Sequence, residues 1–228
     1  MHDIVFFLDF DNTILDNDSL KQDLDERMRE ILGPDHVGAF WSAYEEVRDD
    51  VGVIDFFETG RRLEKSLPGE TTRVRAAVEA IMAWDFRPRL QPRAVETVEY
   101  LNSLGLTMII SDGDPIFQPM KIWQSGLTEA VDGRVLIFGH KEERIVDVAA
   151  RFPARTYVLV DDKPRVLAAC KQRLGERLTT VLMRFGHYGL AADAGAEGVD
   201  VAIDRFDELQ AFGVADFTRG QSEAMPAS

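Results

Sequence analysis

Near its N-terminus the chain reads IVFFLDFDNT at residues 4–13, an apolar run that is followed at once by two aspartates. A run without polar alternation is typical of a strand that is buried on both faces of a parallel sheet. Asp9 and Asp11 follow the carboxyl end of this strand, where ligands bind in open α/β sheets. The stretch therefore predicts a central strand with a polar site at its end, the alternative being a strand exit whose Asp and Asn bond their own turn.

Further short apolar runs predict the rest of the sheet. They lie at 106–110, 135–138, 157–160 and 180–183, mostly with helix-like segments between them. Helical periodicity is clear at 95–104 and again at 145–152. This alternation predicts an α/β fold in which helices sandwich a Rossmann-like parallel sheet.

The segment 19–88 departs from this alternation. It holds helical patterns in succession, at 20–32, 40–47, 56–67 and 74–82, and no convincing buried strand. We expect a small helical domain inserted after the first strand, with residues 1–18 and 89–218 forming the α/β core. The stretch 219–228 is polar and rich in small residues, which predicts a disordered tail.

Composition restricts the class of partner. The formal net charge is −14, whereas nonspecific binding to nucleic acid or anionic membranes depends on clustered Lys and Arg. No apolar run approaches the roughly 20 residues that span a bilayer, and the first run is too short for a signal peptide. The single cysteine, Cys170, fits a buried helix face. We expect a cytoplasmic protein that binds a small molecule, and its oligomeric state stays open.

Three later positions repeat the polar pattern of Asp9–Thr13 at predicted strand ends or helix starts. They carry Ser111, Lys141 and the pair Asp161/Asp162. A hydroxyl can donate to phosphate oxygens, an ammonium can offset negative charge, and paired carboxylates can hold Mg²⁺. Each also has an ordinary interpretation, namely a helix cap, a solvated side chain and turn residues. Their order, each at a strand end, favours a phosphate site in which local cations reverse the negative field of the chain.

This order resembles the four motifs of the haloacid dehalogenase-like superfamily, which run as aspartate-x-aspartate-x-threonine, serine or threonine, lysine, and an acidic pair. They correspond here to Asp9–Thr13, Ser111, Lys141 and Asp161/Asp162. The resemblance covers nearly the whole chain, because one branch of the superfamily places a helical cap, of the C1 type, after the first motif. It implies a phosphatase of that branch.

The resemblance implies a role for each of five side chains. Asp9 would attack phosphorus and form an aspartyl-phosphate, while Asp11 would protonate the leaving oxygen and then activate water. Thr13 and Ser111 would orient phosphate oxygens, and Lys141 would bond both the phosphate and the nucleophile. The implied activity is hydrolysis of a small phosphorylated metabolite.

The resemblance also implies a Mg²⁺ cofactor. Its ligands would be Asp9, the backbone carbonyl of Asp11 and the acidic pair. Asp162 is expected to bind the metal directly, and Asp161 to be a second ligand or to bind through water, although the two could exchange roles.

Three residues depart from the usual pattern, and a fourth stays outside the predicted site. Asp112 stands where asparagine is common, His140 precedes the motif lysine, and Lys163 follows the acidic pair. None of them removes a required group, and Lys163 is expected to be solvated. His187, in a glycine-containing loop, is expected to be structural or exposed.

Contacts to the leaving group are expected from the inserted segment, because a cap excludes water during transfer. The candidates are Arg61 and Arg62 for an anionic group, and Phe40, Trp41, Phe56 and Phe57 for an apolar surface. For each of them a solvated face or a buried core is the stronger interpretation.

Other activities stay open on the same core. A mutase or other phosphotransferase would keep a longer-lived phospho-aspartate, and a phosphonate hydrolase would need Lys21 or Lys65 to form a Schiff base. A noncatalytic binding domain is a further alternative. Carbon–halogen cleavage is disfavoured, because displacement of halide needs neither a metal nor a proton donor such as Asp11.

Overall fold

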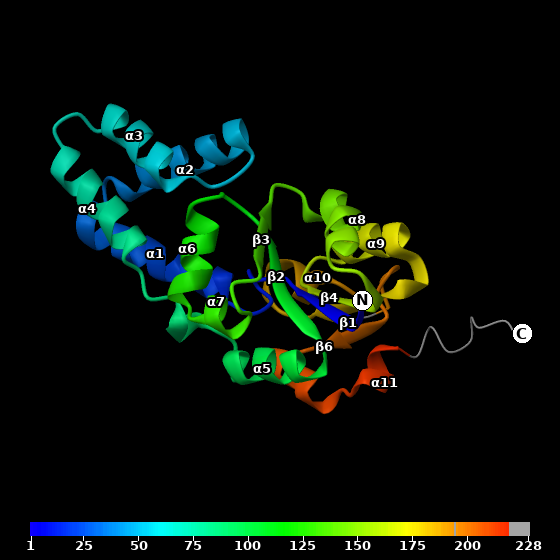
Figure 1. Ribbon diagram of the computed structural model, residues 1–228. Helices are drawn as coiled ribbons and strands as arrows, with labels where there is room; N and C mark the ends of the chain where they lie inside the picture. The colour runs from blue at the N-terminus through cyan, green and yellow to red at the C-terminus, as the bar shows by residue number, and fades with distance from the viewer. Residues whose placement is uncertain (194, 219–228) are drawn as a thin grey trace, which may run out of the picture.

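The computed structural model describes residues 1–193 and 195–218, which form a six-stranded sheet with helices on both faces (Figure 1). The strands are β1 (His2–Leu8), β2 (Leu106–Asp112), β3 (Val135–Phe138), β4 (Ala154–Asp161), β5 (Leu178–Met183) and β6 (Val201–Ile203). Their order is β3-β2-β1-β4-β5-β6, and every neighbouring pair is parallel. The predicted α/β fold class is therefore confirmed.

Strand β1 lies in the middle of the sheet, and its side chains alternate between two hydrophobic clusters. Ile4, Phe6 and Leu8 pack into one cluster, whereas Val5 and Phe7 pack into the other. Each cluster lies between one face of the sheet and the helices that cover it. Because both faces of β1 are buried, the strand is apolar at every position and not at alternate ones.

The helices of the core divide between these two clusters. The first cluster includes residues of α5 (Ala94–Leu104), α6 (Phe117–Gln124), α7 (Leu127–Ala130), η3 (Phe206–Ala211) and α11 (Val214–Phe217). The second includes residues of α8 (Lys141–Arg151) and α9 (Pro164–Leu174). The shorter elements α10 (Gly186–Ala191), η1 (Arg87–Arg89) and η2 (Gly175–Arg177) lie in the connections.

The predicted strands are confirmed, although β4 and β5 begin a few residues earlier than the apolar runs indicated. The apolar runs in the sequence did not predict strand β6. It has only three residues and pairs with β5 alone, so that Ile203 is its one buried residue. So short a strand offers no measurable periodicity.

Between β1 and α5 the chain forms four α-helices that have a hydrophobic core of their own (Figure 1). They are α1 (Asn17–Leu32), α2 (Val37–Val51), α3 (Phe56–Ser66) and α4 (Thr71–Met82). The four predicted helical patterns are thus confirmed as helices. The division into a core of 1–18 and 89–218 and a cap of 19–88 stays a prediction, and the tail predicted at 219–228 lies outside the described residues.

Several contacts tie these helices to the core, among them an ion pair and an aromatic contact. The Nε of Arg89 donates a hydrogen bond of 2.6 Å to Asp23 of α1. The rings of Phe56 on α3 and Phe117 on α6 meet edge to face, with 4.5 Å between their centroids. Among the described residues no helix is both long enough and apolar enough to cross a membrane.

Candidate active site

The predicted site residues gather at the carboxyl edge of the sheet. Because β2, β1 and β4 are neighbours, their ends bring together Ser111, Asp9 and the pair Asp161/Asp162. Lys141 is the first residue of α8, which follows β3. All of these side chains are buried, each with at most 2% of its surface exposed.

Lys141 is the cation at the centre of this group. Its Nζ contacts a carboxylate oxygen of Asp9 and lies 2.6 Å from Oδ2 of Asp161. Burial alone would lower the pKa of Lys141, but the carboxylates of Asp161 and Asp9 raise it, so the amine stays charged. The alternative of a solvated Lys141 is therefore wrong.

The three carboxylates Asp9, Asp161 and Asp162 lie close enough to bind one cation. Each offers an oxygen within 4.8 Å of the other two, and no other such group occurs among the described residues. Asp161 is already engaged, since its Oδ1 accepts a 2.8 Å hydrogen bond from the Lys163 N–H and its Oδ2 faces Lys141. Neither side-chain oxygen of Asp162 has a hydrogen-bond partner.

The pKa values of two carboxylates reflect this excess of negative charge. Burial, opposed by Lys141, raises the pKa of Asp9 to about 6. Burial and repulsion by the other two carboxylates raise the pKa of Asp162 to about 8. The single positive charge of Lys141 does not balance the negative charges of three buried carboxylates. A hard divalent cation, which prefers oxygen ligands, fits the unpaired oxygens of Asp162.

Two hydroxyls lie at this edge of the sheet, and one of them contacts the nucleophile candidate. Thr13 is fully buried, and its Oγ1 donates to Oδ2 of Asp9 over 3.3 Å. Ser111 lies inside β2, and its Oγ accepts a 3.0 Å hydrogen bond from Nε2 of Gln118. The alternative of Ser111 as a helix cap is wrong, because α6 begins only at Phe117 and Asp114 accepts from its first N–H groups.

Asp11 is held by two side chains of α6 that the sequence did not single out. Nζ of Lys121 contacts one carboxylate oxygen, and Nε2 of Gln118 donates to the other over 3.0 Å. Lys121 also donates to Oδ1 of Asn17 over 2.8 Å. Both α6 side chains are nearly buried, at 3% and 4% exposed. Their spacing of three residues places both side chains on one face of α6, and the sequence could have shown this. That this face meets Asp11 depends on the order of the strands, because α6 follows β2 and β2 lies beside β1.

Of the three residues that departed from the usual pattern, Asp112 and Lys163 lie close to site residues, whereas His140 is exposed. Oδ1 of Asp112 accepts a 2.7 Å hydrogen bond from the Lys141 N–H at the start of α8. Lys163 is only partly exposed, and Asp9 and Asp161 raise its pKa against the effect of burial. Lys163 is thus partly solvated, and the start of α9 brings it near the carboxylates. His187 is exposed, and its backbone N–H donates to Asp18 over 2.8 Å.

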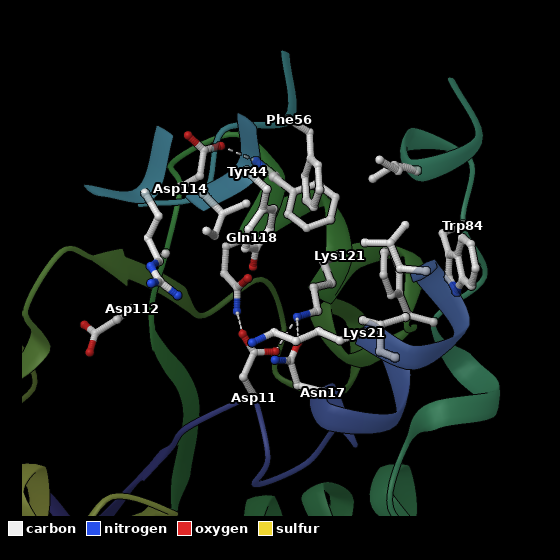
Figure 2. A pocket seen from close by; sticks show the side chains of 18 residues that line it. Asp11, Asn17, Lys21, Tyr44, Phe56, Trp84, Asp112, Asp114, Gln118 and Lys121 are labelled. Atoms are coloured by element: carbon white, nitrogen blue, oxygen red, sulfur yellow. Dashed lines mark hydrogen bonds and ion pairs between the residues drawn. The ribbon is translucent and has the colours of Figure 1, made fainter. Parts of the chain in front are cut away.

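A cavity of about 240 Å³ lies between the inserted helices and the core (Figure 2). One end is polar and includes Asp11, Asn17, Lys21, Gln118 and Lys121. The aromatic part of its wall comprises Tyr44, Phe56, Trp84, Phe86 and Phe117. The cavity therefore opens directly onto Asp11.

Only one of the six leaving-group contacts considered in the inserted segment lines this cavity, namely Phe56. Phe40 is buried in the core of the inserted helices, and Trp41 donates to Asp25 over 2.7 Å. Arg61 and Arg62 both pair with Glu58, and Phe57 is 51% exposed outside the cavity.

No protein-family model and no curated protein sequence matches the chain. Solved structures do match it. A haloacid dehalogenase-like hydrolase from Burkholderia xenovorans is 39% identical over 94% of this chain and 100% of that chain, with a TM-score of 0.83. L-2-haloacid dehalogenase from Xanthobacter autotrophicus is 17% identical over 91% and 96% of the two chains, with a TM-score of 0.59. The HAD-hydrolase YfnB from Bacillus subtilis, bound to magnesium, is 16% identical over 91% and 96%, with a TM-score of 0.58.

Proposed function

Because the chain belongs to the haloacid dehalogenase-like hydrolases, we propose that it is a Mg²⁺-dependent phosphohydrolase that cleaves a small phosphate monoester. The observation that carries this proposal is the buried group around Lys141. There Asp9 is paired with an ammonium, Asp162 is left without a partner, and Asp11 lies two residues beyond the nucleophile at the mouth of a cavity.

The donor set suits Mg²⁺. Asp9 and Asp162 would supply carboxylate oxygens, Asp11 its backbone carbonyl, and Asp161 a further oxygen either directly or through water. When bound, the ion would offset the charge of the phosphoryl group and of the acids around it. A protein of the same fold, YfnB, is bound to magnesium.

The residues of the chain would carry out hydrolysis in two displacements. In the first, a carboxylate oxygen of Asp9 forms a bond to phosphorus while the bond to the leaving oxygen breaks, and Asp11 donates a proton to that oxygen. In the second, Asp11 takes a proton from water, whose oxygen attacks phosphorus and releases Asp9 as the carboxylate. Lys141, Ser111 and Thr13 would donate hydrogen bonds to the phosphoryl oxygens.

Dehalogenation is the weaker candidate for this chain. The likeness to L-2-haloacid dehalogenase, at 17% identity, concerns the fold. Displacement of a halide has no use for a proton donor at Asp11 or for an acidic group such as Asp162. Of the two lysines considered for a phosphonate hydrolase, Lys21 lines the cavity and Lys65 does not, so Lys21 is the one to test.

The first experiment measures phosphate release from 4-nitrophenyl phosphate and from a panel of metabolite phosphates. Wild type and Asp9→Asn are compared with Mg²⁺ and with chelator. We expect release that requires Mg²⁺ and that falls roughly a thousandfold or more in the variant, since a nucleophile cannot be replaced by its neighbours. Equal release by both proteins would contradict the proposal. A stable phospho-aspartate without released phosphate would favour a mutase or other phosphotransferase.

A further inference from the structure

The cavity beside Asp11 has two ends of different chemistry (Figure 2). Figure 2 shows Asp11, Asn17, Gln118 and Lys121 gathered at one end, with Tyr44 and Phe56 toward the other. A substrate whose phosphoryl group lies at Asp9 would place its leaving oxygen near Asp11. The remainder of the leaving group would then extend along the cavity.

The polar end has few free hydrogen-bonding groups. Lys121 is engaged by Asp11 and Asn17, and Gln118 by Asp11 and Ser111. These bonds hold the polar side chains to one another. Lys21, which makes no ion pair among the described residues, also lines this end. Asp112 and Asp114 line the cavity as well, but Oδ1 of each already accepts from backbone N–H groups.

Most of the wall beyond this end is apolar. Leu20, Leu24, Ile54 and Ile81 line it together with the aromatic side chains. Tyr44 adds a hydroxyl to this part of the wall, and Trp84 adds an indole nitrogen. Arg48 also borders the cavity, but it pairs with Glu45 and is half exposed.

The aromatic rings of the wall pack on one another where the inserted helices meet the core. Phe117 packs edge to face on Phe56, and its centroid lies 6.1 Å from that of Phe86. Phe56 also packs on Tyr44, with 5.9 Å between centroids. Such a surface favours a flat ring, which can add further edge-to-face contacts.

We propose that the leaving group is an arylalkyl alcohol, so that the substrate is the phosphate monoester of an aromatic alcohol and not of a polyhydroxylated sugar. This inference rests on the proposed function. Each sugar hydroxyl in the apolar part would lose its water without a replacement partner, which lowers affinity on the order of tenfold per group. Hydrolysis takes up one water and yields the free alcohol and inorganic phosphate.

The test compares kcat/KM for benzyl phosphate, ribose 5-phosphate and acetyl phosphate in the holoenzyme with Mg²⁺. Acetyl phosphate reports on the proposed catalytic residues, because its acetate leaving group carries no ring that could pack on the aromatic wall. We expect benzyl phosphate to exceed ribose 5-phosphate by at least about tenfold. Equal values, or a preference for ribose 5-phosphate while acetyl phosphate is turned over, would overturn the inference and leave the proposed function intact.

Adjacent residues of α3 provide matched variants. Phe56 lines the cavity and Phe57 is exposed outside it, so Phe56→Ala and Phe57→Ala make the same change at neighbouring positions. The ratio of kcat/KM for benzyl phosphate to that for acetyl phosphate should fall about tenfold in the first variant and stay unchanged in the second. Because Phe56 also supports the inserted helices, Phe56→Leu serves as the milder variant. An unchanged ratio in both Phe56 variants, with folding verified, would contradict the inference.

A binding measurement decides the matter even if no phosphate is released. Benzylphosphonate and methylphosphonate are titrated while tryptophan fluorescence is followed, with Trp84→Phe identifying the signal of the cavity wall. We expect benzylphosphonate to bind at least about tenfold more tightly than methylphosphonate. Equal affinities would overturn the inference, and absence of turnover with every ester would count against the proposed function alone.

Discussion

Asp162 is a buried carboxylate that folding leaves without a partner, which is unusual for a charged group. Its pKa of about 8 means that the folded protein binds a proton at this position more tightly than the unfolded chain does. The stability that comes from the protonated form is therefore present at low pH. It is lost as the pH rises from about 4 through about 8.

We predict that Asp162→Asn stabilises the metal-free protein, and more so as the pH rises from 5 to 8. The amide keeps the volume of the side chain but carries no charge to be repelled by Asp9 and Asp161. Thermal unfolding in chelator measures this, with the exposed Asp35→Asn as the control. Adding Mg²⁺ should then raise the melting temperature of wild type more than that of the variant. If the melting temperatures of wild type and Asp162→Asn in chelator differed by the same amount at every pH, this account would be contradicted.

Lys121 acts, in our interpretation, through Asp11. We predict that Lys121→Met lowers kcat about tenfold to a hundredfold, because Asp11 loses one of its two α6 partners and its carboxylate is then misplaced relative to the leaving oxygen. The loss should be larger for benzyl phosphate than for 4-nitrophenyl phosphate, since a poor leaving group depends more on proton donation. Lys171→Met, which removes an ion pair with Asp200 on another surface, is the control. An equal loss for both substrates would indicate a purely structural role.

At the level of elements, helix α6 links the proposed catalytic residue Asp11 to the cavity. Phe117 contributes to the aromatic wall, while Gln118 and Lys121 reach Asp11 from the same helix. Gly113, in the turn between β2 and α6, leaves room for this arrangement. A Cβ atom at that position would lie 3.0 Å from the side chain of Gln118.

We predict that Gly113→Ala lowers turnover about tenfold, because the added methyl group pushes Gln118 away from Asp11 and Ser111. The effect on the melting temperature should be small. Gly38→Ala is the matched control, since a Cβ there meets nothing within 4 Å and the position lies inside α2. That change should stabilise by about 0.5–1 kcal/mol and leave kcat unchanged. Wild-type kinetics in Gly113→Ala would contradict the role of the turn.

At the scale of the whole molecule, an acidic chain surrounds the site that we propose for a phosphate ester. The sequence has 40 acidic residues against 26 Lys and Arg. Lys141, Lys163 and Lys121 are the cations that lie next to the acidic motif residues, and all three are at least partly buried. Local positive charge of this kind is needed because the field of the remaining surface repels phosphate.

We predict that salt stabilises the metal-free protein. Raising NaCl from about 0.01 M to about 0.15 M shortens the Debye length from about 30 Å to about 8 Å, which screens the repulsion among surface acids. The buried group around Lys141 is screened much less. Thermal unfolding in chelator over this range should therefore show a rising melting temperature. A falling melting temperature would mean that surface ion pairs outweigh the net repulsion of −14 charges.

The sequence by itself determined the fold class and the positions of the motif residues. Strands buried on both faces are apolar at every position, so the run before Asp9 and the later runs could be recognised locally. Parallel strands end at one edge of a sheet, so Ser111, Lys141 and the acidic pair could be expected near Asp9.

Only the tertiary structure decided what surrounds these residues. Gln118 and Lys121 lie 107 and 110 positions from Asp11 along the chain, and they meet it because β2 lies beside β1 and α6 follows β2. The wall of the cavity likewise combines side chains of the inserted helices with Phe117 of the core. Local periodicity shows which face of a helix is apolar but not which partner that face meets. Strand order and helix packing, which depend on contacts distant in sequence, therefore determined the partners of Asp11, the unpaired carboxylate of Asp162 and the chemistry of the cavity.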